Sequence, residues 1–276
     1  MDMEINPQQH QEQIIRIVSQ VGNGAHIFAP KEWINEKVLI VRLEKKSIKE
    51  EILQRIYSYL DKIIGVFIYG SQARGEATEN SDIDILIIAK EKFKIKKEGN
   101  FEFVVITEDY LNKAIETNPI MMYSIFREAK AVINEKYLDN LRKIEINSAL
   151  FKPFIQTTKE SLKSDEEVIE LDKKTGKTIS NSVIYSLILR LRGIFIINNL
   201  LNNQKYSNSL FKTWINHECK VDYNKVYSIY QALRSGKELG DETLIEQGEV
   251  LINLLKEELK KLEVLIDKYG KKKKET

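Results

Sequence analysis

Two aspartates separated by one residue, Asp82 and Asp84, stand at the start of an apolar run that continues to residue 89. Side chains alternate between the two faces of a β-strand, so both carboxylates are expected on one face while Ile83 and Ile85 point to the other. Carboxylate oxygens are ligands that Mg²⁺ prefers, and a pair of Mg²⁺ ions also binds substrate phosphates. The spacing therefore predicts a magnesium-binding strand edge.

A second polar group precedes the aspartates. Gly70 and Ser71 end an apolar run and begin a short polar segment. A glycine lets the backbone pass close to a phosphate, and Ser71 offers an N–H and a hydroxyl to the same anion at the start of a helical turn. Arg74 lies in the same segment, and its planar guanidinium suits bidentate phosphate contacts. An ion pair of Arg74 with Glu76 or Asp82 is the alternative.

The order Tyr69-Gly70-Ser71, then Asp82-Ile83-Asp84, resembles the DNA polymerase β-type nucleotidyltransferase superfamily, and most closely its minimal members. In that family a third acid lies between apolar residues on a later strand. Glu102 in Phe101-Glu102-Phe103 matches it best, with a surface carboxylate on an edge strand as the alternative. The resemblance implies a Mg²⁺-dependent enzyme that moves a nucleoside monophosphate, expected to be AMP from ATP, onto an acceptor hydroxyl with release of pyrophosphate.

The resemblance also implies the site residues. The acids expected to hold two Mg²⁺ ions and carry catalysis are Asp82, Asp84 and Glu102, and the residues expected to bind the nucleotide are Gly70, Ser71 and Arg74. Glu102 is either a metal ligand or the base for the acceptor proton. Three crowded carboxylates repel, so at least one should have a raised pKa without metal. The acceptor remains open between a protein hydroxyl, a small molecule and a tRNA end.

Composition is that of a soluble globular protein. The formal net charge is +2, from 43 basic and 41 acidic residues, which argues against a dedicated polyanion-coating protein. The lone Cys219 cannot form a disulfide within the chain, and the N-terminus does not read as a signal peptide, so a cytoplasmic location is expected. Arg190 and Arg192 interrupt the apolar run of residues 183–201, which favours a buried core helix over a membrane span.

The sequence predicts an α+β fold in three blocks. Residues 1–46 form a small β-rich module with strands at 14–21, 25–29 and 38–43. The module resembles small archaeal modules related to the AbrB-type swapped-hairpin DNA-binding fold, on residues 21–33 and 38–43. The resemblance implies DNA contact or a homodimer, and the alternative is a β-rich cap on the enzyme domain. A catalytically weak nucleotide-binding regulator, or an antitoxin-like protein that binds DNA through this module, is the rival function.

Residues 47–146 are predicted to form the nucleotidyltransferase domain, a small mixed sheet with helices on one face. Its expected elements are a helix at 48–64, strands leading into Gly70 and out of Asp84, the Glu102 strand at 101–107, helices at 108–115 and 121–127, and a strand at 131–134. The charged segment 91–100 is expected to be a loop.

Residues 147–270 are predicted to be a helical bundle, with helices at 151–164, 178–199, 207–216, 223–235 and 241–269, followed by a basic disordered tail at 271–276. Segments 185–192, 206–214 and 226–230 resemble the HEPN-like and kanamycin-nucleotidyltransferase C-terminal domains. Gly270 is expected to end the last helix. Arg190 and Arg192 either face the catalytic cleft or pair with acids inside the bundle.

Overall fold

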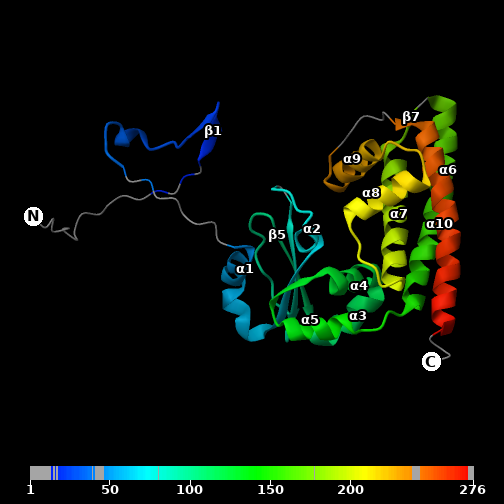
Figure 1. Cartoon of the computed structure of the whole chain (residues 1–276), viewed down its shortest axis with the longest axis horizontal. Coiled ribbons are helices and arrows are strands. Elements are labelled where there is room, and N and C mark those ends of the chain that lie inside the picture. Colours follow the sequence, from blue (N-terminus) through cyan, green and yellow to red (C-terminus); the bar gives the residue numbers. More distant parts are fainter. Residues whose placement is uncertain are drawn as a thin grey trace, which may run out of the picture. The chain divides into compact units, whose positions relative to one another are not determined.

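The computed structural model describes residues 14, 16, 18–38, 40, 47–79, 81–176, 178–237 and 243–272. The chain divides into two compact units, Met1–Lys46 and Ser47–Thr276 (Figure 1). The boundary expected between residues 146 and 147 lies inside the second unit, which holds both the sheet and the helical block.

The first unit contains a short antiparallel hairpin. Strand β1 (Ser19–Val21) pairs with β2 (Gly24–His26), and Gly22 adopts a φ of +54° in the turn, a conformation that glycine reaches without steric cost. Both strands are shorter than the sequence predicted. A single 3₁₀ turn follows at Lys31–Trp33. The third strand expected at 38–43 falls mostly outside the described residues.

The second unit begins with helix α1 (Ile48–Ile56), which starts at a capping box. The Ser47 hydroxyl accepts the backbone N–H of Glu50, and the Glu50 carboxylate accepts the backbone N–H of Ser47 at 2.7 Å. The helix predicted to reach residue 64 changes after Ile56 to a 3₁₀ helix, Tyr57–Lys62. Strand β3 begins at the next residue, Ile63, so this segment leads directly into a central strand of the sheet.

A four-stranded mixed sheet forms the centre of this unit, in the order β5–β4–β3–β6. Strand β3 (Ile63–Tyr69) is antiparallel to β4 (Ile83–Ala89) and to β6 (Lys130–Ile133), whereas β4 is parallel to β5 (Phe101–Thr107). The α+β fold with a mixed sheet is therefore confirmed. The short helix α2 (Gly70–Arg74) leaves β3 at the end where β4 begins (Figure 1).

The sheet is buried on both faces because β3 and β4 are apolar apart from Asp84 near the start of β4 and Tyr69 at the end of β3. Val66 and Ile85 pack with Ile52 and Ile56 of α1 on one face. Phe67 and other residues of the opposite face pack against helices that include α3 (Leu111–Thr117), α4 (Pro119–Glu128) and α5 (Glu135–Arg142). The predicted layer of helices on one face is present, and α1 adds cover to the other.

The helical block follows a 3₁₀ turn at Ser148–Phe151. Its elements are α6 (Lys152–Thr175), β7 (Thr178–Ile179), α7 (Asn181–Leu201), α8 (Asn208–Glu218), α9 (Tyr223–Arg234), β8 (Thr243–Leu244) and α10 (Ile245–Lys272). Helices α6, α7 and α10 run side by side (Figure 1). By length and composition alone, helix α7 would suit a membrane span. In this protein, however, 61% of its most apolar stretch of 18 residues is buried.

Several predicted helix boundaries in this block are wrong, including the start of the last helix at 241, since α10 begins at Ile245 after β8. Helix α7 starts at Asn181 because Thr178 and Ile179 pair instead with Leu244 and Thr243 as a two-residue strand. Helix α6 extends to Thr175, eleven residues beyond the predicted end. Helix α10 continues through Gly270 to Lys272, and Gly270 has no left-handed φ there, so it does not act as a helix stop. Residues 273–276 of the expected tail lie outside the described residues.

One hydrophobic cluster joins the sheet to the helical block. It contains Phe67 of β3, Phe126 of α4, Phe151 of the 3₁₀ turn and Leu187 of α7, all fully or almost fully buried. The sheet and the bundle therefore share apolar surface, and neither can be removed without exposing the other to water.

Candidate active site

The expected acidic edge is present at the ends of two neighbouring strands. Strands β4 and β5 run parallel with Ile83 opposite Phe101 and Asp84 opposite Glu102. Residues opposite each other in a parallel pair point to the same face, so the two carboxylates share one face of the sheet. Asp82 stands just before β4. Glu102, the third acid predicted from the sequence, therefore lies beside Asp84.

Uncompensated negative charge gathers at this edge. The pKa of Asp84 is raised to about 6, first by burial and then by the charge of Glu102, with a smaller contribution from Asp82. Arg234 and Arg74 oppose this rise without cancelling it. The expectation that crowding raises the pKa of at least one of these acids is met at Asp84.

Glu102 is bound by a lysine that the sequence gave no reason to single out. Lys97 Nζ lies 2.6 Å from Glu102 Oε1, and this contact is the main cause of the raised pKa of Lys97. Lys97 belongs to the charged loop between β4 and β5, and its side chain is 68% exposed. An exposed pair of this kind is weak and easily replaced by another cation.

Gly70 lies directly against Asp84. Its φ is +69°. A Cβ added to Gly70 would overlap the Asp84 carboxylate and would lie 3.1 Å from Asp84 Cγ. A glycine is needed here for two reasons, the left-handed backbone and the approach of an acidic side chain. The sequence offered only close phosphate approach as the reason. The contact brings the Gly-Ser turn and the acidic edge together as one site.

Arg74 is held by two carboxylates. Its Nε lies 2.8 Å from Glu76 Oε2 and its Nη1 lies 2.8 Å from Glu128 Oε2, and all three side chains are mostly buried. The pKa of Arg74 is raised, because burial, which lowers it, is outweighed by the hydrogen bonds and charges of Glu76 and Glu128. The predicted ion pair with Glu76 is present. Glu128 also accepts the backbone N–H of Gly70 at 3.0 Å.

A family model for the nucleotidyltransferase domain matches residues 45–173. This match covers the whole sheet, the Gly-Ser turn and all three acids. The chain carries a nucleotidyltransferase domain.

Among curated proteins, a stretch of 50 residues is 44% identical to a Methanocaldococcus jannaschii protein named a putative protein adenylyltransferase. The stretch is 18% of this chain and 50% of that protein, so the chain spans about half the length of the curated relative it matches.

Two solved structures share a broad similarity. The spectinomycin adenyltransferase of Enterococcus faecialis, crystallised with ATP and spectinomycin, is 16% identical, with 76% of this chain and 97% of that one covered at a TM-score of 0.43. A nucleotidyltransferase-like protein of Exiguobacterium sibiricum is 14% identical, with 80% and 76% covered at a TM-score of 0.37. These values are too low to bear on substrate.

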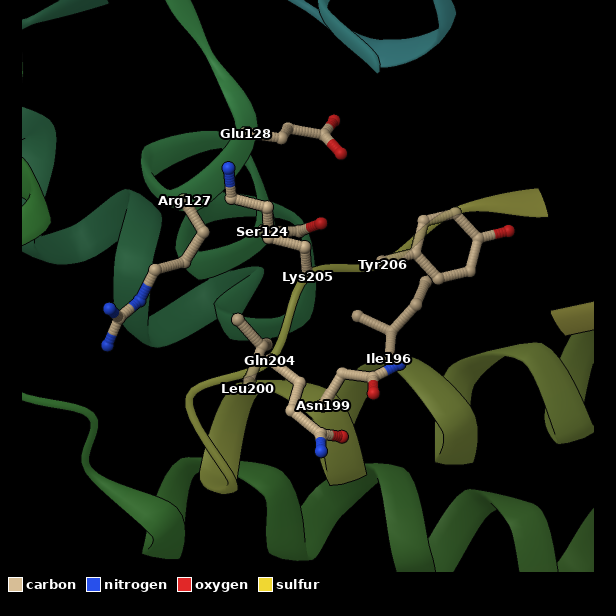
Figure 2. Close-up of a pocket in the computed structure, with 9 residues that line it drawn as sticks. All are labelled: Ser124, Arg127, Glu128, Ile196, Asn199, Leu200, Gln204, Lys205 and Tyr206. Carbon is tan, nitrogen blue, oxygen red and sulfur yellow. The ribbon is translucent and has the colours of Figure 1, made fainter. Parts of the chain in front are cut away.

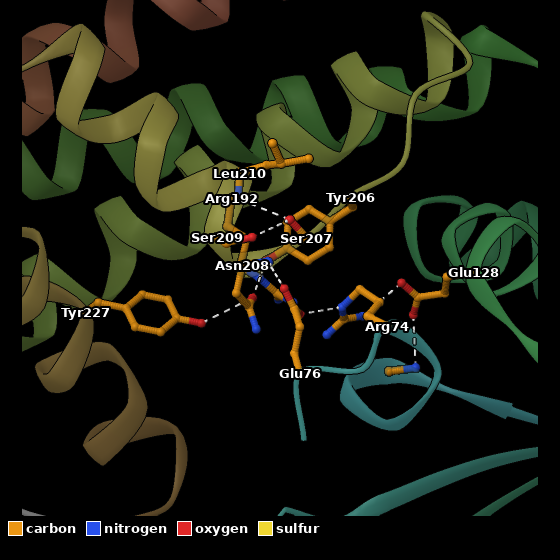
Figure 3. Close-up of polar contacts among 11 residues, drawn as sticks. Arg74, Glu76, Glu128, Arg192, Tyr206, Ser207, Asn208, Ser209, Leu210 and Tyr227 are labelled. Atoms are coloured by element: carbon orange, nitrogen blue, oxygen red, sulfur yellow. Dashed lines mark hydrogen bonds and ion pairs between the residues drawn. The ribbon is translucent and has the colours of Figure 1, made fainter. Parts of the chain in front are cut away.

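Hydrogen bonds connect the nucleotidyltransferase domain to the helical block (Figure 3). Glu76, which follows α2, accepts the backbone N–H of Asn208 at 2.7 Å, the first residue of α8. The Asn208 side chain in turn accepts the hydroxyl of Tyr206 at 2.6 Å and that of Tyr227 at 3.4 Å. The guanidinium of Arg74 also lies over the Tyr206 ring, 5.2 Å from its centre.

Arg192 contacts a tyrosine and not one of the acids that were expected as its partners inside the bundle. Its Nε donates to the Tyr206 hydroxyl at 2.7 Å, and its guanidinium lies 5.1 Å from the Tyr206 ring centre. The pKa of Arg192 is raised, since burial, which lowers it, is outweighed by Tyr206 and neighbouring tyrosines. Arg190 donates instead to the hydroxyl of Thr157 at 3.2 Å.

A small pocket that is open to solvent lies between α4 and the end of α7 (Figure 2). Its lining residues are Ser124, Arg127, Glu128, Ile196, Asn199, Leu200, Gln204, Lys205 and Tyr206. The amide nitrogen of buried Asn199 has no hydrogen-bond partner among the described residues. Glu128 therefore borders both this pocket and the Gly-Ser turn.

The acidic edge suits a hard divalent cation in chemistry and charge. Its donors are carboxylate oxygens, and burial together with the charge of Glu102 raises the pKa of Asp84, so a cation bound there would relieve the repulsion between the acids. Within the described residues, however, no three His, Cys, Asp or Glu side chains are arranged to hold a metal ion as they stand, and Glu102 is bound to Lys97. The full set of three acidic ligands stays a prediction.

Sequence reasoning missed Glu128 and Lys97 as partners of the site. Glu128 lies 58 residues beyond Gly70 at the end of α4, with no local pattern that marks it. A charged residue at the end of a helix is usually solvated, and only the packing of α4 beside α2 gives Glu128 its contacts.

Proposed function

We propose that this protein is a Mg²⁺-dependent adenylyltransferase that moves AMP from ATP onto an acceptor hydroxyl and releases pyrophosphate. The proposal rests on the close approach of Gly70, Asp84 and Glu102. Asp84 stands opposite Glu102, and the Gly70 backbone lies against the Asp84 carboxylate. A phosphate held by the Gly-Ser turn is thereby next to the acids that bind its counter-ions.

The proposed roles follow from position. Asp82 and Asp84 would hold Mg²⁺, with Glu102 as the third acid once Lys97 has moved away. Bound there, the ions would neutralise phosphate charge and lower the pKa of the acceptor hydroxyl. Glu102 Oε would also be available to take the acceptor proton, because its ionic partner among the described residues is the exposed Lys97.

The nucleotide contacts are assigned to the Gly-Ser turn. The backbone N–H of Gly70 and the N–H and hydroxyl of Ser71 would donate to the β- and γ-phosphates, and Arg74 would supply positive charge. The base and the ribose of the nucleotide would need further contacts, and Tyr206 of the helical block lies next to Arg74.

The nucleotide and the acceptor class are inferred from the curated relative. That protein is named for protein adenylylation, and its match to this chain supports ATP as donor and a protein hydroxyl as acceptor. A small molecule and a tRNA end are the other outcomes of the test.

The test is transfer of label from each of the four ribonucleoside triphosphates, carrying ³²P at the α-phosphate, to components of a cell lysate. Label from ATP should enter the protein fraction only with Mg²⁺, and Asp84→Asn should abolish it. Asp139→Asn is the matched control, because the Asp139 side chain is exposed and pairs with Arg142 within α5. Equal transfer by wild-type protein and Asp84→Asn would exclude the proposed site.

A further inference from the structure

The carboxylate of Glu128 occupies the donors that the proposed function assigns to the triphosphate. Glu128 Oε1 accepts the Gly70 backbone N–H at 3.0 Å, and Glu128 Oε2 lies 2.8 Å from Arg74 Nη1. The Glu128 side chain is only 13% exposed and that of Arg74 only 11%. One carboxylate thus bridges the turn and the guanidinium with both of its oxygens.

This arrangement conflicts with anion binding. A backbone N–H makes one good hydrogen bond, so Gly70 cannot serve Glu128 and a phosphate oxygen together. A carboxylate and a polyphosphate also repel at short range in a partly buried site. Glu128 has the charge and the bidentate geometry of a phosphate oxygen pair, and it already fills the place that a phosphate needs.

The pocket next to Glu128 offers the carboxylate another position. Arg127 and Lys205 both line this pocket together with Glu128, but the Arg127 guanidinium points away from Glu128 (Figure 2) and donates to Asn203 Oδ1 at 2.7 Å. Lys205 belongs to the segment between α7 and α8, and among the described residues no carboxylate is within ion-pair distance of it. A rotation of the Glu128 side chain would take its charge from Arg74 toward Lys205.

We propose that Glu128 is a carboxylate gate on the phosphate-binding turn, which competes with the nucleotide triphosphate for Gly70 and Arg74 and turns toward Lys205 when the nucleotide binds. The proposal rests on the proposed function, since it needs a triphosphate at the Gly-Ser turn. It makes Glu128 a positioning residue whose removal strengthens nucleotide binding.

A purely supporting role predicts the opposite sign. If Glu128 only held the turn and Arg74 in shape, its loss would loosen both and weaken nucleotide binding. If Glu128 competes, the fraction of protein ready to bind is small, and the apparent dissociation constant falls when the competitor is removed. The direction of the change in affinity therefore separates the two roles.

The test is equilibrium binding by calorimetry with ATP and Mg²⁺, with inorganic tripolyphosphate, and with adenosine. Glu128→Gln, which keeps shape and loses charge, and Glu128→Ala should bind ATP and tripolyphosphate on the order of tenfold more tightly than wild-type protein. Adenosine affinity should not change. Glu51→Gln is the control, because Glu51 pairs with Arg55 on distant α1.

A double-mutant cycle tests the second position of the carboxylate. Lys205→Met should weaken ATP binding in wild-type protein and leave it unchanged in Glu128→Gln. Thermal unfolding checks that Glu128→Gln is folded. If Glu128→Gln is unstable, Glu128→Ala takes its place in the binding measurements.

Unchanged or weaker ATP binding in folded Glu128→Gln would overturn the gate while leaving the proposed function standing. Absence of binding to ATP and tripolyphosphate in wild-type protein and every variant would overturn both.

Discussion

Replacing Asp84 by Asn should make the metal-free protein more stable at pH 8 while abolishing transfer. The pKa of Asp84 in the folded protein is about 6, against a reference of 3.8, so folding favours its protonated form. Above pH 6 the folded protein must hold an ionised carboxylate beside Glu102 at a cost in free energy of unfolding. Asn has the same shape and no charge, and removes this cost.

The magnitude follows from the two pKa values. A difference from 3.8 to about 6 corresponds to about 3 kcal/mol, at 1.36 kcal/mol for each pH unit. Asp84 is only half-buried, so solvent screening reduces this to about 1–2 kcal/mol. Such a change raises the Tm of a protein of this size by about 2–4 °C for each kcal/mol.

The pH dependence has a defined sign. Below pH 4 Asp84 is protonated in the folded and unfolded chain alike, so the variant should gain nothing there. The gain should appear between pH 4 and 6 as the unfolded chain ionises first, and should be complete above pH 6–7. It is the reverse of the usual case, in which a carboxylate with a lowered pKa stabilises the fold above its pKa.

The measurement is thermal and urea unfolding of both proteins from pH 4 to 8 with EDTA, repeated with Mg²⁺. Mg²⁺ should stabilise wild-type protein and have little effect on Asp84→Asn, because ligands that bind only the folded state raise its stability. Equal stabilities of the two proteins at pH 8 in EDTA, or a difference that is the same at pH 4, would refute the reasoning.

Three further predictions concern the same unit. Gly70→Ala should cost more than about 1 kcal/mol, because a left-handed φ and the Asp84 carboxylate both exclude a Cβ, and a Tm equal to that of wild-type protein would contradict this. Glu102→Gln should stop transfer without changing circular dichroism, and full activity would show that neither metal binding nor proton transfer needs this carboxylate. Ending the chain after Ile146 should give a protein that binds a hydrophobic dye, because the shared cluster loses its other half. A sharp cooperative transition in that fragment would show the opposite.

The strands could be predicted from the sequence, because an apolar run bounded by polar turns is a local signal. The predicted strand at 101–107 is the observed β5, and Asp84 was correctly expected near the beginning of β4. The alignment of Asp84 with Glu102 could not be predicted from such a local signal. Nothing in residues 101–103 reveals the register of a parallel strand, so only the family pattern pointed to Glu102.

Contacts between distant segments explain most of what the sequence did not show. Thr178 and Ile179 lie in a stretch that suits a helix, yet they pair with residues more than sixty positions away. Gly270 was expected to stop α10, but a helix packed along α6 and α7 continues when its apolar face is buried. Likewise, no local sequence pattern around Glu128 predicts that its side chain lies beside Gly70.

The parallel register of β4 and β5 also determines which insertions and deletions this protein can accept. The two acids are aligned by ladder hydrogen bonds from Ile83–Phe101 to Ala89–Thr107, and the loop between the strands does not define that alignment. Lengthening the loop near Gly99 would leave the alignment intact. One residue added inside β5 ahead of Glu102 would turn its carboxylate to the opposite face. Natural length variation in relatives should therefore collect in the loop and be absent from the strand.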